Sequence, residues 1–272
     1  MPNIDCEKII QENLISVAGF AGMAALKAPK MAKTNIKFEI LTEDEVLPLA
    51  EIVGILGEQS AFTAGDAAIG KLAHEQGSPI VAVLIGADTT TSDLNWNCGA
   101  CGFDSCAEFN AYVKKNKSAG PYYGGPSCNW KNLDFGIAHS WACAAAWQMN
   151  VENRAQTSYG AVGMMLGHLE GCNVCVALSL GPCRDQVWYS RPDLKHSFDM
   201  KEHEQFMLSC LPQMQVGFTG GGYPMMKHGP AWGAEPKYLK MMEDPEWAEK
   251  HQDIIRRVVE VLEREKAKQD NA

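Results

Sequence analysis

The sequence predicts an α/β or α+β fold, with helices around a small sheet and an amphipathic helix at its C-terminal end. Two observations support this fold class. Segments with apolar residues at helical spacing alternate along the chain with short apolar runs typical of strands. A cysteine-rich stretch, residues 95–109, also follows the most apolar of these runs. We therefore expect a mixed fold with a metal-binding loop inserted after a strand.

The part of the chain before the cysteines contains helices and strands in alternation. Apolar residues recur at helical spacing in residues 3–27. Thr42, with Glu45 three residues later, forms a capping-box pattern that starts a helix running toward Leu56. The other elements expected here are a helix near residues 66–76 and strands at residues 37–41 and 79–87.

Helices and strands also alternate in the chain after the cysteines. Asp134 is expected to cap a helix of small residues that extends to Met149. Asp244 and Pro245 mark the start of a final helix. Its apolar stripe, for which packing on the same chain is favoured over a partner, comprises Trp247, Ile254, Ile255, Val258 and Leu262. The other expected elements are helices at residues 157–169 and 200–211 and strands at residues 173–180 and 187–190.

Composition and charge narrow the classes of protein. The 272 residues allow a substantial core, and 46% hydrophobic with 21% charged residues is typical of a soluble globular protein. A net charge of −9 argues against binding to nucleic acid or an anionic membrane, and suits a basic redox partner. The longest apolar run, residues 80–87, is too short to cross a bilayer, and no secretion signal is visible. We expect a cytoplasmic protein in which the ten cysteines are metal ligands or buried residues rather than disulfides.

The cysteine spacing indicates an iron–sulfur cluster. Cys98, Cys101 and Cys106 lie within nine residues, separated mostly by glycine and alanine, and Cys128 follows in a Gly/Pro-rich stretch. Four thiolates suit a [4Fe-4S] cluster, and small residues between them let backbone N–H groups turn toward the sulfurs. The sequence therefore predicts that these four cysteines hold the cluster.

Zinc and a redox dithiol are the alternatives. Structural zinc sites typically use two short Cys-x-x-Cys knuckles. Here the only other such pair is Cys172 and Cys175, which lies in an apolar strand-like run and is expected to serve packing. Zinc thus fits the pattern less well than a cluster.

The chain also resembles a known family. CGACGFDSC, residues 98–106, resembles the four-iron motif CGxCGxxxC. Residues 133–154, LDFGIAHSWACAAAWQMNVENR, resemble a signature of the DUF2148-like family of ferredoxin-domain-containing proteins from anaerobic bacteria and archaea. LKAPK at residues 26–30 and LSLGPCRDQVWYSRP at residues 178–192 are similar to two further stretches of that family. The resemblance implies one [4Fe-4S] cluster held by the four matching cysteines.

The resemblance ends before the C-terminal part. Residues 193–272 have no counterpart in the family pattern, so we expect a ferredoxin-domain-like core at residues 1–192, with its iron–sulfur loop at 95–130. Residues 193–272 are expected to form a C-terminal extension with a Gly-rich loop and a terminal helix. The chain also departs from the pattern where Leu26 and Lys27 replace Arg-Thr and where Glu152 replaces Asp.

Four further residues are candidates for contacts with a substrate or the cluster. Glu152 and Arg154 follow an apolar helix, and Arg191 precedes a proline. Each forms part of a surface ion pair or helix end in one interpretation, and of a substrate site in the other. His139 is either a core histidine, which we favour, or a proton donor beside the site.

Two other features suggest additional chemistry. Cys183 lies next to Arg184, which would lower its pKa and make it a reactive thiol or a second cluster ligand; a free surface thiol is the simpler interpretation. Lys27 and Lys30 follow a long helix and form either a solvated basic face or an anchor for the phosphate of FMN. Flavin reductases of the nitroreductase type have a loosely similar order of elements.

Four functional hypotheses remain open. The first is an iron–sulfur protein with a redox role, either electron transfer to a partner or reduction of a small-molecule substrate beside the cluster. The second is a flavin-linked reductase of nitroreductase-like type. The third is an open-iron Lewis-acid enzyme, which requires that Cys128 is not a ligand. The fourth, least favoured, is a zinc-stabilised interaction module. A homo-oligomer is compatible with each.

Overall fold

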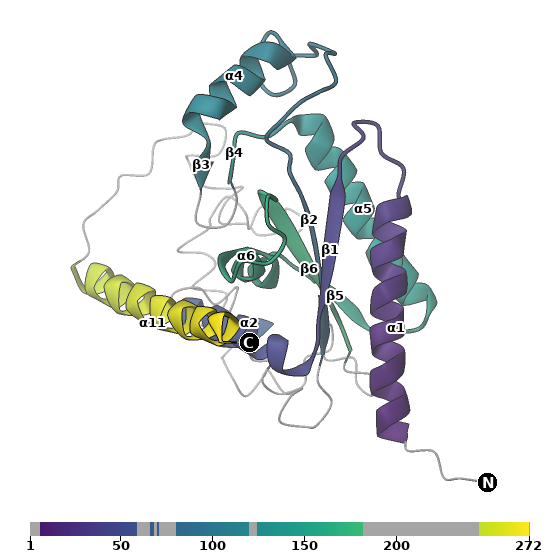
Figure 1. The fold of residues 1–272 in the computed structure, drawn as a ribbon, viewed down its shortest axis with the longest axis vertical. Coiled ribbons are helices and arrows are strands. Elements are labelled where there is room, and N and C mark those ends of the chain that lie inside the picture. The colour runs from purple at the N-terminus through teal and green to yellow at the C-terminus, as the bar shows by residue number, and fades with distance from the viewer. Residues whose placement is uncertain are drawn as a thin grey trace, which may run out of the picture.

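The computed structural model describes residues 6–58, 66–67, 70, 80–119, 124–181 and 245–271. Four of its strands form a central sheet, and helices cover both faces of that sheet (Figure 1). The strands are β1 (Ile36–Leu41), β2 (Val81–Ala87), β3 (Ser118–Ala119), β4 (Gly124–Gly125), β5 (Asn153–Gln156) and β6 (Val174–Leu180). The helices are α1 (Cys6–Lys27), η1 (Glu43–Glu45), α2 (Leu47–Leu56), α4 (Cys106–Asn116), α5 (Asn129–Gln148), α6 (Thr157–Met165) and α11 (Pro245–Asp270). The mixed helix-and-sheet fold class is confirmed.

The sheet is antiparallel and has the strand order β1-β2-β6-β5. Every residue of the central strand β2 is buried, because helices cover both faces of the sheet. Val81 pairs with Leu180 and Ala87 pairs with Val174, so the last residue of β2 and the first residue of β6 lie at the same end of the sheet. The cysteine segment begins at this end of the sheet.

One face of the sheet is covered by α1 and α5, which pack directly against each other. Their contact is lined by fully buried alanines, among them Ala21 and Ala25 on α1 and Ala138 and Ala142 on α5. Side chains this short let the axes of two helices approach closely. The small residues of α5 are therefore explained by helix packing.

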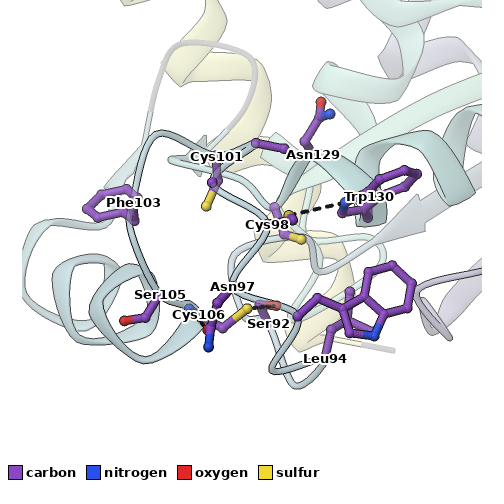
Figure 2. Close-up of a pocket in the computed structure, with 14 residues that line it drawn as sticks. Ser92, Leu94, Asn97, Cys98, Cys101, Phe103, Ser105, Cys106, Asn129 and Trp130 are labelled. Carbon is purple, nitrogen blue, oxygen red and sulfur yellow. Dashed lines mark hydrogen bonds between the residues drawn. The ribbon is translucent and has the colours of Figure 1, made fainter.

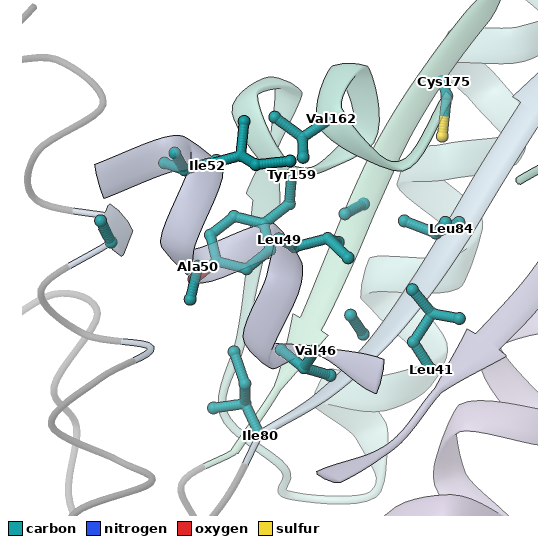
Figure 3. Close-up of a cluster of buried hydrophobic side chains, with 14 of the residues drawn as sticks. Leu41, Val46, Leu49, Ala50, Ile52, Ile80, Leu84, Tyr159, Val162 and Cys175 are labelled. Carbon is teal, nitrogen blue, oxygen red and sulfur yellow. The ribbon is translucent and has the colours of Figure 1, made fainter. Parts of the chain in front are cut away.

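The opposite face is covered by α2, α6 and α11, whose apolar side chains form a second core around Leu49, Leu84 and Tyr159 (Figure 3). The backbone of α6 lies very close to the sheet: a Cβ on Gly160 would be 2.4 Å from the carbonyl oxygen of Cys175. Only glycine permits this approach. Cys175 is fully buried in this core, as its strand-like surroundings predicted.

The terminal helix α11 contributes to this second core, as the favoured packing of its stripe on the same chain predicted. Ile254 and Val258 are buried, as the predicted stripe required, and Val261 joins them. Ile255, also placed in the stripe, is 45% exposed instead. Ion pairs from Arg257 to Glu58 and from Arg264 to Glu51 fix α11 beside α2.

Three sequence expectations need correction or comment. The small-residue helix begins at Asn129, so Asp134 lies inside it and does not cap it. The capping-box bond from the Thr42 N–H to Glu45 is present at 3.0 Å, but it caps the short helix η1 before α2.

By length and composition, Lys8–Lys27 is apolar enough to cross a membrane, although core helices of soluble proteins pass the same test. The expected strand at 187–190, the helix at 200–211 and most of the helix at 66–76 lie outside the described residues.

Candidate metal centre

All four cysteines predicted as cluster ligands line a single pocket (Figure 2). Cys98 and Cys101 lie on the loop that follows β2, and Cys106 is the first residue of α4. Cys128 precedes the first residue of α5 and so comes from a separate segment. The structure therefore brings together thiols that are up to 30 residues apart in sequence.

The loop that carries Cys98 and Cys101 is shaped by residues with left-handed backbone angles. Gly99 and Gly102 have φ values of 71° and 85°, and the Gly102 N–H donates to the Gly99 carbonyl at 2.9 Å. Glycine adopts these angles without the steric penalty of other residues. This tight turn directs the chain from one thiol to the next.

Helix N-termini provide positive potential at two of the thiols. Cys106 is at the start of α4, where the Ser105 hydroxyl caps the helix by accepting the Glu108 N–H at 3.1 Å. Cys128 occupies the capping position of α5. The positive end of each helix dipole stabilises negative charge on sulfur. Both buried cysteines thus lie where the start of a helix can offset the negative charge of a bound cluster.

Hydrogen bonds to sulfur add to this effect. The Ser92 hydroxyl donates to Cys106 Sγ at 3.5 Å, and it is the main reason that the pKa of the Cys106 thiol is below its ordinary value. The Trp130 Nε1–H donates to Cys98 Sγ at 3.2 Å (Figure 2). Donors of this kind are the surroundings that tune a bound cluster.

Cys128 is positioned by a buried polar network centred on Asn173. The Asn173 side chain accepts from the Thr89 N–H at 2.6 Å and donates to the Gly124 carbonyl at 2.8 Å. The Thr89 carbonyl in turn accepts the Cys128 N–H at 2.7 Å. These bonds tie the Gly/Pro-rich stretch to the end of β2, which fixes the fourth thiol relative to the other three.

A small hydrophobic cluster underlies the pocket. Phe109, Val113 and Cys128 are its buried members, and Phe103 and Trp130 pack around them. Phe109 also contacts Phe103 edge-on, with ring centroids 5.7 Å apart. The cysteine segment therefore has a core of its own, although a much smaller one than the sheet.

The donor set of the pocket fits an iron–sulfur cluster. Four thiols from two segments are the ligand chemistry that a four-iron cluster requires. Among the described residues, no three His, Cys, Asp or Glu side chains are grouped so that they could hold a metal ion between them. The four cysteines therefore share the pocket without forming a ready-made single-ion site, and their role as ligands stays a prediction.

Glu152 and Arg154 do not line this pocket. They lie at the start of β5, where Asn153 pairs with Leu180, and Leu180 pairs with Val81 at the far end of β2. The six residue steps from Val81 to Ala87 separate them from the cysteine end of the sheet by about 20 Å. The interpretation that they surround the cluster is not supported by this placement.

His139 is a buried residue of α5, as the favoured interpretation proposed. It lies eleven residues after Cys128, or about 16 Å along the helix axis. Its Nδ1 is 3.6 Å from the Sγ of Cys143, and burial lowers the pKa of His139 to about 4 and raises that of Cys143 to about 11. This neutral imidazole is not placed to donate protons beside the pocket.

The remaining candidates divide into two groups. Lys30 donates from Nζ to the carbonyls of Leu26 and Ala28, so it caps the end of α1, while Lys27 is exposed nearby. A flavin phosphate at these lysines stays a prediction. Cys183 and Arg191 lie outside the described residues.

Two residues beside the pocket were missed by sequence reasoning. Asn173 is 4% exposed, and its only sequence signal was a polar residue between Cys172 and an apolar strand. Trp130 followed Cys128 closely in sequence, but nothing in the pattern indicated that its N–H would reach Cys98. Both act through contacts with residues more than 30 positions away.

The comparisons with known proteins support the predicted relationship over part of the chain. A protein from Archaeoglobus fulgidus, described as an uncharacterized protein, is 29% identical over 113 residues, which are 42% of this chain and 58% of that relative. The chain thus aligns with little more than half the length of this relative. No solved structure matches. Residues 124–191, which include Cys128, match the family described as "uncharacterized protein containing a ferredoxin domain (DUF2148)", the same family that the sequence motifs resemble, and this match suggests an iron–sulfur protein.

Proposed function

We propose that the chain binds a [4Fe-4S] cluster through Cys98, Cys101, Cys106 and Cys128 and has a redox role. In this role it passes single electrons to a partner, or to a substrate bound beside the cluster. The observation that carries the proposal is that four thiols from two separate segments line one pocket. The ferredoxin-domain match at residues 124–191 supports it.

The cluster, when bound, supplies a reversible one-electron couple. The chain would hold it by four thiolates, and the starts of α4 and α5 would offset its negative charge. Cys106 and Cys128 are buried, whereas Cys98 is exposed. Electron exchange with a partner is therefore expected at the Cys98 side, where the distance to solvent is shortest.

The position of Cys128 favours electron transfer over the open-iron alternative. Lewis-acid chemistry needs one iron without a protein thiolate, but Cys128 is held in the pocket lining by the Asn173 network. Lys30 already bonds two carbonyls, so the flavin-linked alternative gains no support. We also propose a cytoplasmic, reducing location, because exposed thiols such as Cys98 persist in reduced form there.

Anaerobic reconstitution with iron and sulfide tests the proposal. The expected product contains about four iron and four sulfide ions per chain and has a broad absorption band near about 400 nm. Cys128→Ala should yield a labile cluster that loses iron and changes its EPR signal. Cys172→Ala, which alters a half-buried thiol outside the pocket, should behave as the parent. Stoichiometric zinc without iron, or a Cys128→Ala protein with the parental four-iron signal and stability, would contradict the proposal.

A further inference from the structure

The outer sides of α1 and α5 form an apolar surface on the molecule. Of the fifteen large apolar side chains that are exposed among the described residues, ten lie on α1, on α5 or just beyond the ends of these helices. Trp141 and Trp147 are 48% and 61% exposed, and Phe20 and Met23 on α1 are about half exposed. We call the outward sides of residues 13–26 and 133–150 the α1/α5 face. Figure 1 shows the two helices on the same side of the sheet, where they pack against each other.

The α1/α5 face carries no exposed charge. Residues 13–26 and 135–150 contain no Asp, Glu, Lys or Arg, although 21% of the chain is charged. Asp134 is 1% exposed and accepts hydrogen bonds from the N–H groups of Met31 and Ala32, so its charge does not reach this surface. An exposed apolar surface of this size without charges is characteristic of a protein or membrane contact.

Among the described residues, no contact explains two helical glycines on this face. A Cβ on Gly22 would collide with the Phe38 ring, so that glycine is required by intramolecular packing. A Cβ on Gly19 or Gly136 would meet no atom of the described part of the chain within 4 Å. Glycine inside a helix costs about 1 kcal/mol relative to alanine. Close approach of something outside the chain would account for glycine at both positions.

We propose that the α1/α5 face is the interface of a homodimer, in which it packs against the same face of a second copy. Eight half-exposed large side chains within this face offer roughly 800 Å² of apolar area at ~100 Å² each, and a stable interface needs about 800 Å² from each partner. Tryptophan and methionine are enriched in such interfaces. A two-fold pairing uses one surface twice, so the match between the two sides is built in.

Charge favours a second copy over the other occupants. Two chains of net charge −9 repel each other, and pairing through an uncharged face places no like charges in contact. Helices that lie on an anionic membrane surface carry Lys and Arg beside their apolar side. The α1/α5 face has none between residues 13 and 26 or between 135 and 150. A second copy is therefore the occupant that the chemistry of this face fits best.

Sedimentation velocity of the full chain tests the dimer, with or without bound iron, because the inference does not depend on the cluster. The expected mass is twice 29.8 kDa. Trp141→Glu should shift the protein to the monomer mass, because it introduces a charge into the otherwise uncharged α1/α5 face. Ile255→Glu changes a similarly exposed apolar residue on α11 and should remain dimeric. Circular dichroism shows whether each variant is folded.

Gly136→Leu keeps the test decisive if Trp141→Glu fails to fold. Leucine is the better helix former, so the monomer should be at least as stable, whereas the larger side chain should block close approach and weaken dimerisation at least tenfold. A wild-type protein that sediments as a monomer would overturn the proposal. So would a folded Gly136→Leu protein that dimerises like the parent, or a monomeric wild type that co-sediments with vesicles of phosphatidylcholine and phosphatidylglycerol.

Discussion

The helix-covered sheet and the cysteine segment are held together in different ways. The sheet lies between two extensive apolar cores, and its central strand β2 is buried along its whole length. The cysteine segment has a cluster of only three buried residues, supported by the polar network around Asn173. Apolar burial alone can account for the sheet. The cysteine segment has so little of it that we expect a bound cluster to contribute part of its stability.

Removal of the cluster should therefore affect the two regions very unequally. Because metal-site binding energy is also folding energy, anaerobic chelation of iron should abolish amide protection in residues 95–116 while β2 and β6 keep theirs. Hydrogen exchange with and without chelator measures this. A Cys98→Ala chain that cannot assemble the cluster should show the unprotected pattern before treatment. Equal loss of protection in both regions would break the comparison.

Asn173→Ala should show how far the polar network substitutes for apolar burial. It leaves the buried Thr89 N–H and the partly buried Gly124 carbonyl without these partners, at a cost of about 1–3 kcal/mol for the buried group and less for the other. We expect about 2–4 kcal/mol lower unfolding free energy in chemical denaturation and faster iron loss, because Cys128 is no longer held. Asn13→Ala removes an exposed amide on α1 and is the matched control. Unchanged iron release would show that Asn173 does not position Cys128.

His139 provides a test within the sheet region. Its pKa falls from an ordinary 6.5 to about 4 because burial disfavours the charged ring. The unfolded chain thus binds a proton at higher pH than the folded chain, so stability is lost as pH falls from 6.5 toward 4 and is unaffected above 6.5. Between about pH 8 and about pH 5 the loss should be about 2 kcal/mol. Denaturation of His139→Gln should show a flatter pH dependence, and an identical slope would refute the assignment.

Sequence patterns predicted the elements whose own residues determine them. α1, β2 and β6 have apolar periodicity that needs no partner to be read. β5, with the sequence NRAQ, was missed because its pairing with β6 decides its conformation. The start of α5 was misplaced because Asp134 looked like a cap, whereas its carboxylate bonds the chain about 100 residues earlier.

The same division applies to the candidate site. Cys98, Cys101 and Cys106 could be selected from their spacing, because ligand spacing is a local property of the loop, and Cys128 from its Gly/Pro-rich surroundings. Asn173 and Trp130 could not be selected in this way, because their roles depend on which strand ends and helix starts meet at one end of the sheet. Glu152 and Arg154 were associated with the site by motif, but the strand register places them at the opposite end of the sheet from the cysteines.

Trp130→Phe should produce the smallest effect and the most specific one. The substitution keeps an aromatic ring in the small hydrophobic cluster but removes the N–H that donates to Cys98 Sγ at 3.2 Å. A donor to a ligating sulfur stabilises the more negative, reduced cluster, so its loss should move the midpoint potential to a more negative value. Iron content and unfolding free energy should change little.

Trp96, which contacts the Trp130 ring edge-on at 5.8 Å, offers the control: Trp96→Phe keeps the Trp130 donor and should leave the potential near that of the parent. Redox titration monitored by EPR measures both variants. Equal potentials in the two variants would show that the Trp130 hydrogen bond does not tune the cluster, and a loss of iron in Trp130→Phe alone would show that the ring is needed for binding instead.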